Sequence, residues 1–156
     1  MNFDPGSPDP EARAPLVLDQ VLARHALERP DAPALHFDGR VFDYGKLSRR
    51  TARATARLWH GWGVRAGDRV AYLGLNHPDQ ITLLFALARI GAVLVPLNFR
   101  LAQAEWQAVL ADCTPRCVLH DPAWAEAATA LAQAADLPAH AIDTLIATHA
   151  PGVYAA

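Results

Sequence analysis

Residues 88–101 read ARIGAVLVPLNFRL, and this stretch decides the fold that the sequence predicts. Gly91 follows the last residue of a helical pattern and can take the left-handed conformation that ends a helix. Ala92–Pro96 is apolar throughout, which is typical of a buried strand in a parallel sheet. Arg100 follows the end of this strand. The stretch therefore predicts a helix, a tight stop and a buried strand in direct succession.

The residues before this stretch supply the first half of a β-α-β unit. A short strand is expected at Arg69–Leu73, and Asn76-His77-Pro78 then turns the chain. Pro78 stands where a proline commonly opens a helix. The apolar face of that helix is expected to consist of residues at helical spacing, namely Ile81, Leu84, Phe85 and Ala88.

The residues after this stretch continue the alternation. We expect a helix around Ala104–Asp112 that buries Trp106, Val109 and Leu110, followed by a strand at Arg116–Leu119. A further helix is expected from the stripe of Trp124, Ala127, Ala128 and Leu131, and a short strand at His140–Ile142. Alternating strands and helices predict βαβ units. The predicted fold class is therefore α/β, with a partial, doubly wound, mainly parallel sheet and flanking helices.

The N-terminal part carries a different pattern, which predicts two helices and a hairpin. The first helix is expected from Leu18, Val21, Leu22 and Ala26 and ends at Pro30; the second is expected from Leu47, Thr51, Ala54 and Leu58. Between them, Asp38-Gly39 separates two apolar runs, and this dipeptide favours a tight hairpin turn. Asp43 can cap the second helix, and Gly61 or Gly63 can end it.

Composition and length limit the possible functions. The chain has 156 residues, of which 52% are hydrophobic and 19% charged, with a net charge of −2. Such a weak charge does not favour nucleic acid as a partner. The longest apolar run, Ile81–Val95, is interrupted by Arg89 and is too short to span a membrane. We expect a cytoplasmic protein with a flexible leader over 1–15, a folded domain over 16–146 and an unstructured tail over 147–156.

The sequence contains no pattern that indicates a catalytic or metal-binding group. The glycines of 61–67 follow a helix and precede a strand, so they are interpreted as a helix stop and turn and not as a phosphate loop. Cys113 and Cys117 lack a second ligand pair at zinc spacing and are expected to be reduced, metal-free thiols. The arginines between Arg49 and Arg57 are expected to form a solvated helix face.

Four segments resemble, in the same order and spacing, the AMP-forming acyl-CoA synthetases. Residues 42–47, FDYGKL, resemble F-[ST]-Y-x-E-L; residues 63–71, GVRAGDRVA, resemble G-V-x-x-G-D-R-V-A; residues 75–78, LNHP, resemble the L-x-N-x-x turn. Residues 88–101 are similar to A-x-x-G-A-V-x-V-P-L-N-x-R-L, with Glu105 at a commonly acidic position beyond. Asp43 replaces the family's Ser or Thr, and Lys46 replaces its Glu. The resemblance covers about residues 18 to 120.

The resemblance implies an enzyme that joins a fatty acid or other carboxylic acid to CoA, with ATP and Mg²⁺, through an acyl-AMP intermediate. Family members hold the ATP phosphates in a Ser/Thr/Gly-rich loop that ends in P-K-G, and they use a lysine in a small C-terminal domain. These 156 residues contain neither that loop nor a segment that matches the C-terminal domain. We therefore expect the N-terminal part of such an enzyme, inactive on its own. The resemblance places Arg100 near a phosphate of CoA, with an ion pair at the start of the next helix as the alternative.

Two other hypotheses belong to different functional classes. The chain could be a stand-alone, non-catalytic α/β binding or assembly module, which could pair with a separately encoded remainder. It could also be a nucleotide-binding Rossmann-type domain, but the sequence lacks G-x-G-x-x-G.

Overall fold

A four-stranded parallel sheet forms the centre of the protein. The computed structural model describes residues 18–147, and the sheet has the order β4-β3-β5-β6. Its strands are β3 (Arg69–Leu73), β4 (Val93–Leu97), β5 (Cys117–His120) and β6 (Ala139–Ala141), and every neighbouring pair is parallel. The predicted α/β class and the parallel sheet are confirmed. The expected leader 1–15 lies outside the described residues, as does the expected tail apart from Ala147.

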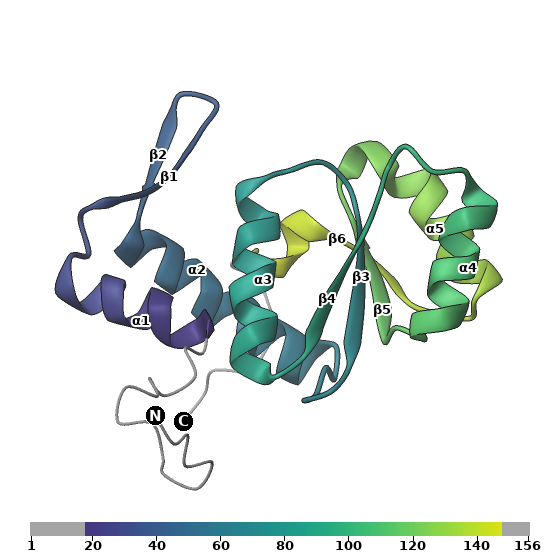
Figure 1. Ribbon diagram of the computed structural model, residues 1–156, viewed down its shortest axis with the longest axis horizontal. Coiled ribbons are helices and arrows are strands. Elements are labelled where there is room, and N and C mark those ends of the chain that lie inside the picture. Colours follow the sequence, from purple (N-terminus) through teal and green to yellow (C-terminus); the bar gives the residue numbers. More distant parts are fainter. Residues whose placement is uncertain (1–17, 148–156) are drawn as a thin grey trace, which may run out of the picture.

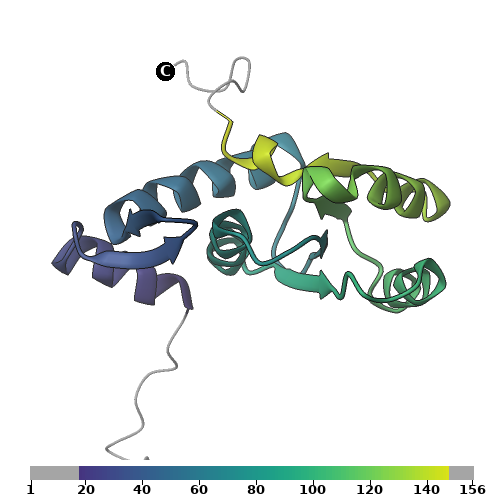
Figure 2. The ribbon, with the colours of Figure 1, turned by 90° about the horizontal axis from the view of Figure 1, so that it is seen from above.

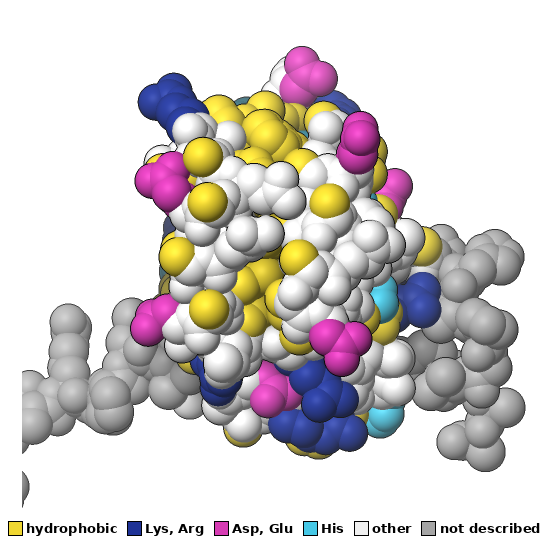
Figure 3. All heavy atoms as spheres, turned by 90° about the vertical axis from the view of Figure 1, so that its right-hand side faces the viewer, with side chains coloured by type: hydrophobic (Ala, Val, Ile, Leu, Met, Phe, Trp, Pro, Cys, Tyr) yellow, Lys and Arg dark blue, Asp and Glu magenta, His cyan; other side chains and the backbone are white. Residues whose placement is uncertain are grey.

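Helices cover both faces of this sheet. Helix α3 (Pro78–Ile90) lies on one face, and α4 (Gln103–Cys113) and α5 (Ala125–Ala134) lie on the other (Figures 1 and 2). Two short turns complete the layers, η2 (Pro122–Trp124) and η3 (Ile142–Leu145). Each face has its own hydrophobic cluster, one around α3 and one around α4 and α5. Apolar side chains also line a furrow between α4 and α5 (Figure 3).

The N-terminal elements form a further layer, beyond α3 as seen from the sheet. They are α1 (Leu18–Glu28), the antiparallel hairpin of β1 (Pro33–Phe37) and β2 (Arg40–Asp43), α2 (Tyr44–Ala56) and a π-helical turn, η1 (Arg57–Gly61) (Figure 1). At the hairpin turn, Asp38 and Gly39 have φ values of 48° and 68°, as the dipeptide predicts. The Asp43 side chain accepts a hydrogen bond from the Lys46 amide, which confirms the predicted cap.

The predicted apolar face of α3 is wrong by about half a turn. The fully buried side chains are Thr82, Leu83, Ala86 and Leu87, whereas Ile81, Leu84, Phe85 and Ala88 are only half-buried. Nearly every position of this helix is small or apolar, so its periodicity does not select one face. The sheet contacts one side of α3 while α1 and α2 contact the other, and a helix covered on both sides is apolar on both.

Strand β4 was predicted as a buried strand, and this is also a correction. It lies at the edge of the described sheet, and Val93 is 49% exposed. The Val93 amide donates to the Asp68 carbonyl at 2.8 Å, so the backbone of Val93, and of every second residue after it, bonds toward β3. The backbone groups of the residues in between, including Pro96, point away from β3. Proline has no N–H to offer and is therefore tolerated in edge strands. Pro96 was the signal in the sequence that this strand lies at the edge of the described sheet.

Candidate functional site

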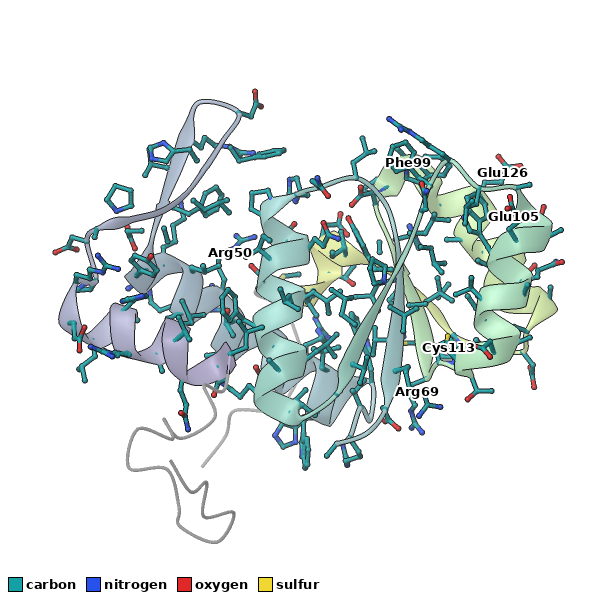
Figure 4. All side chains as sticks on the ribbon, viewed as in Figure 1. Arg50, Arg69, Phe99, Glu105, Cys113 and Glu126 are labelled. Carbon is teal, nitrogen blue, oxygen red and sulfur yellow. The ribbon has the colours of Figure 1, made fainter. Side chains whose placement is uncertain are left out.

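The candidate site lies at the carboxyl ends of the parallel strands. Residues 74–76 follow β3, residues 98–100 follow β4 and Asp121 follows β5 directly. In open α/β sheets, ligands bind in the crevice at this end, because loops from several strands converge there. In Figure 4, Phe99 marks this end of the molecule, while Arg69 and Cys113 lie at the opposite end.

Arg100 is an exposed residue in the turn after β4. Its backbone amide donates to Asn98 Oδ1 at 3.0 Å, and its guanidinium carbon lies 5.5 Å from the centre of the Phe99 ring. None of the ion pairs within residues 18–147 includes Arg100. Glu105, the nearest acidic residue at the start of α4, instead accepts a hydrogen bond from the Ala102 amide at 2.8 Å. The guanidinium is therefore available to an anion.

An aromatic cluster fixes the turn that carries Arg100. Trp106 Nε1 donates to the Asn98 carbonyl at 2.8 Å, so a side chain of α4 anchors the backbone of the turn. The Phe99 ring lies 5.9 Å from the Trp124 ring, and Trp124 lies 6.0 Å from Trp106 in an edge-to-face arrangement. Such ring pairs contribute beyond the apolar area they bury. The backbone position of Arg100 is thus set by contacts from two helical segments.

Asp121 fixes the neighbouring loop. Its Oδ1 accepts a hydrogen bond from Tyr72 Oη at 2.7 Å, and its Oδ2 accepts one from the Leu75 amide at 2.7 Å. Burial, followed by the hydrogen bond to Asp121, raises the pKa of Tyr72 well above its usual range, so the phenol stays protonated and donates. A Cβ on Gly74 would overlap both the Asp121 carboxylate and the Tyr72 hydroxyl, so a larger residue fits here only if these groups are displaced.

Tyr72, Gly74 and Asp121 were not among the predicted site residues. The available signal was an aspartate placed directly after an apolar strand, at the end of the sheet where polar residues gather. The partner hydroxyl could not be found in this way, because Tyr72 lies inside an apolar strand pattern and 49 residues from Asp121.

A small pocket lies between the two loops. It has a volume of about 290 Å³ and is lined by Tyr72, Gly74, Asn76, Gln80, Pro96, Leu97, Asn98 and Phe99. Its side-chain polar groups are amides and one hydroxyl, which bind neutral polar groups by hydrogen bonds and do not transfer protons readily near neutral pH. Within residues 18–147, no cluster of His, Cys, Asp and Glu is arranged to hold a metal ion.

Two arginines of the expected solvated face, Arg50 and Arg57, are half-buried. Arg49 and Arg53 are exposed, but Arg50 forms an ion pair with Asp79 in the first turn of α3, and its side chain is 21% exposed. Asp79 is also 3.4 Å from His77 Nδ1. The pair joins α2 to α3, and both of its side chains are largely shielded from solvent.

The two cysteines do not form a disulfide with each other. Cys117 is buried in β5, and burial raises the pKa of its thiol to about 12. Burial also raises the pKa of the half-buried Cys113 thiol. Both thiols are therefore poor nucleophiles. That they are reduced and metal-free in solution stays a prediction.

Comparisons with known proteins agree on one family. Residues 22–154 match the family model described as "AMP-binding enzyme". The chain is 48% identical over 109 residues to the feruloyl-CoA synthase of an Amycolatopsis species, which covers 70% of this chain and 22% of that protein. It is 39% identical over 105 residues to the indoleacetate–CoA ligase of Aromatoleum aromaticum, covering 67% of this chain and 20% of the relative.

Solved structures share the fold. A structure described as a long-chain-fatty-acid CoA ligase from Rhodopseudomonas palustris superposes with a TM-score of 0.77 at 29% identity. The superposition covers 85% of this chain and 37% of the other. The chain therefore spans about a fifth of the length of the curated relatives it matches and about a third of this solved one.

Proposed function

The chain belongs to the AMP-binding enzyme family, and from this membership we propose that it supplies the N-terminal part of an AMP-forming acyl-CoA synthetase. The observation that carries the proposal is the 48% identity to a feruloyl-CoA synthase over 109 residues, which is 70% of this chain. The complete reaction joins a carboxylate to ATP, with release of pyrophosphate, and then transfers the acyl group from AMP to the thiol of CoA.

Within this reaction, the proposed role of this part is to bind CoA through Arg100. The guanidinium is exposed, lies outside every ion pair of residues 18–147 and is held at the carboxyl end of β4. Arginine binds phosphate through charge-assisted hydrogen bonds, which are stronger than neutral ones. An anionic phosphate of CoA fits this position, whereas the amides of the adjoining pocket suit uncharged parts of a ligand.

The residues of this chain do not fit the ATP phosphates or Mg²⁺. The 156 residues contain no P-K-G loop, and their single lysine, Lys46, lies in the first turn of α2, beside Phe42. No cluster of carboxylates within 18–147 is arranged for a cation. Binding of ATP and Mg²⁺ is therefore assigned to the rest of the enzyme, and the 156-residue chain alone is proposed to be inactive.

A chimera tests the proposal. Residues 18–120 of this chain would replace the matching segment of the Amycolatopsis feruloyl-CoA synthase, and pyrophosphate exchange and thioester formation would be assayed with ferulate. We expect both activities to persist. A chimera that folds, as judged by circular dichroism and thermal unfolding, but lacks exchange would sink the proposal and favour the stand-alone binding module.

Arg100→Ala in the same chimera tests the CoA role. We expect the KM for CoA to rise roughly 10- to 100-fold, because one charge-assisted hydrogen bond is worth about 1.5–3 kcal/mol, while ferulate-dependent pyrophosphate exchange stays unchanged. Arg53→Ala, which removes an exposed arginine from α2, is the matched control and should change neither value. An unchanged KM for CoA in Arg100→Ala would remove Arg100 from the site.

A further inference from the structure

Positive and negative charges are separated along the chain. Residues 18–67, which form α1, the hairpin, α2 and η1, contain nine Lys and Arg residues against five Asp and Glu residues, a formal charge of +4. Residues 68–147 contain four against eight, a formal charge of −4. Helices α1 and α2 lie at one end of the molecule and α4 and α5 at the other (Figure 1). Such an asymmetry between two halves of a chain is associated with binding to membranes or nucleic acids.

Most of the excess positive charge lies in a row on α2 and η1. Lys46, Arg49, Arg53 and Arg57 follow one another at intervals of three or four residues, so they share one helical face. Together these four residues form the basic stripe, which is about 17 Å long at the helical rise. The first three are exposed and Arg57 is half-buried. Residues 44–67 contain no Asp or Glu.

The acidic groups of the described residues do not neutralise the basic stripe. None of the ion pairs within residues 18–147 includes one of its members. Asp43, the nearest acid in the sequence, accepts a hydrogen bond from the Lys46 amide at the start of α2. The acids of the neighbouring α1 are paired with other arginines, Asp19 with Arg89 and Glu28 with Arg24. Cations four residues apart repel one another and weaken a helix, and an external anion would relieve this repulsion.

An exposed tryptophan indicates the kind of anion. Trp59 lies in η1, two residues after the end of the basic stripe, and is 39% exposed. The guanidinium carbon of Arg65 lies 4.3 Å from the centre of its ring, so one face of the ring is already covered. A base of a single-stranded nucleic acid would need such a face for stacking. A partly buried tryptophan beside cations is instead typical of the headgroup region of a bilayer, where tryptophan is enriched.

We propose that the basic stripe and Trp59 form a docking surface for an anionic membrane. A bilayer is planar, so it meets only the end of the molecule that carries α2. The exposed acids Glu105, Asp112 and Glu126 lie on α4 and α5, beyond α3 and the sheet. Each such layer is about 8–10 Å thick, which is enough for salt to screen these acids from the lipid, because the Debye length is about 8 Å. The contact is electrostatic, since the apolar face of α2 packs on α1 and α3.

Co-sedimentation of the 156-residue chain with lipid vesicles tests the surface. We expect binding to vesicles of phosphatidylcholine and phosphatidylserine mixed at about two to one, and no binding to phosphatidylcholine alone. Raising NaCl from about 0.05 M to about 0.5 M should abolish the binding, because salt screens exposed charges.

Charge-removing variants assign the binding to the basic stripe. Arg53→Gln should weaken binding to the anionic vesicles roughly fivefold, and Arg49→Gln combined with Arg53→Gln roughly 25-fold, because each cation near the lipid contributes separately. Arg116→Gln is the matched control, since it removes one exposed arginine from the start of β5, in the acidic half of the chain, and should leave binding unchanged.

The proposal is wrong if the chain does not bind the anionic vesicles, or binds both kinds of vesicle equally. It is also wrong if the double variant, folded as judged by circular dichroism, binds as tightly as the wild type. If the double variant does not fold, Arg53→Gln alone decides, and unchanged binding is the contradicting result. Release of the chain from the vesicles by single-stranded RNA at an equal phosphate concentration would assign the basic stripe to nucleic acid and overturn the proposal.

Discussion

At the scale of single residues, three side chains and backbone segments are packed tightly together at the carboxyl end of the sheet, those of Tyr72, Gly74 and Asp121. Asp121 accepts from Tyr72 Oη and from the Leu75 amide, and the backbone of Gly74 passes so close to this carboxylate that a side chain fits only if the carboxylate is displaced. Here a glycine is required by a close approach and not by its φ angle. A hydrogen bond to a charged group contributes about 1.5–3 kcal/mol, so breaking either contact would be costly.

Gly74→Ala should lower the free energy of unfolding by about 2 kcal/mol, in the range typical of overpacked or broken networks. The added Cβ would displace the Asp121 carboxylate and weaken both of its hydrogen bonds. Urea unfolding followed by tryptophan fluorescence measures the change. Gly61→Ala is the control, because its Cβ would meet only the flexible Arg57 side chain, at 3.1 Å. Equal midpoints for the two variants would contradict this account of Gly74.

At the scale of elements, α3 is the helix on which the other layers meet. One side packs on the sheet, and the other receives α1 and α2. Two ion pairs join it to those helices, Arg50 with Asp79 near its start and Arg89 with Asp19 near its end, the latter at 2.8 Å. The half-buried Ile81 and Leu84 line a groove of about 420 Å³ between α3, the hairpin and β4.

Adjacent leucines of α3 give a direct test of its corrected orientation. Leu83→Ala should cost about 3 kcal/mol, because Leu83 is fully buried against the sheet and its removal leaves a cavity. Leu84→Ala should cost about 1 kcal/mol, because this side chain faces the groove and is already partly solvated. Denaturant unfolding of the two variants measures both values. A larger loss for Leu84→Ala would restore the face that the sequence pattern predicted.

At the scale of the whole molecule, the described residues form layers in the order hairpin and helices α1 and α2, helix α3, sheet, and helices α4 and α5 (Figures 1 and 2). The candidate site, with Arg100 and the Asp121 loop, lies where the strands of the sheet have their carboxyl ends. None of the helices within residues 18–147 is long and apolar enough to cross a bilayer.

The purified 156-residue chain should not catalyse ATP–pyrophosphate exchange with any carboxylic acid. Acyl-AMP formation brings a carboxylate against a triphosphate. The sequence has no P-K-G loop to offset that repulsion, its single lysine, Lys46, lies in α2, and residues 18–147 contain no cluster arranged to hold a cation. A panel of short, medium, long and aromatic acids, ferulate and indoleacetate included, would be assayed against boiled protein. The prediction would be overturned if the chain catalysed exchange faster than boiled protein does and if substitutions in the chain abolished that exchange.

The sequence by itself determined the element order, the parallel sheet and the turn chemistry, because these depend on short-range patterns. Asp38-Gly39 predicts its turn, Asp43 its cap and Gly91 its left-handed helix stop, which has a φ of 80°. The four family motifs also lie within contiguous stretches. They were enough to place the chain with the AMP-binding enzymes and to select Arg100 as a candidate.

Only the tertiary structure decided which side of each element is covered, and which distant residues meet. The pattern of α3 is apolar all round, so its buried face depends on neighbours that the pattern does not name. The position of β4 at the sheet edge depends on strand order, which Pro96 alone hinted at. Contacts between Tyr72 and Asp121 or between Trp62 and His140 join residues far apart in sequence. Local propensity carries no information about such pairs, because packing creates them.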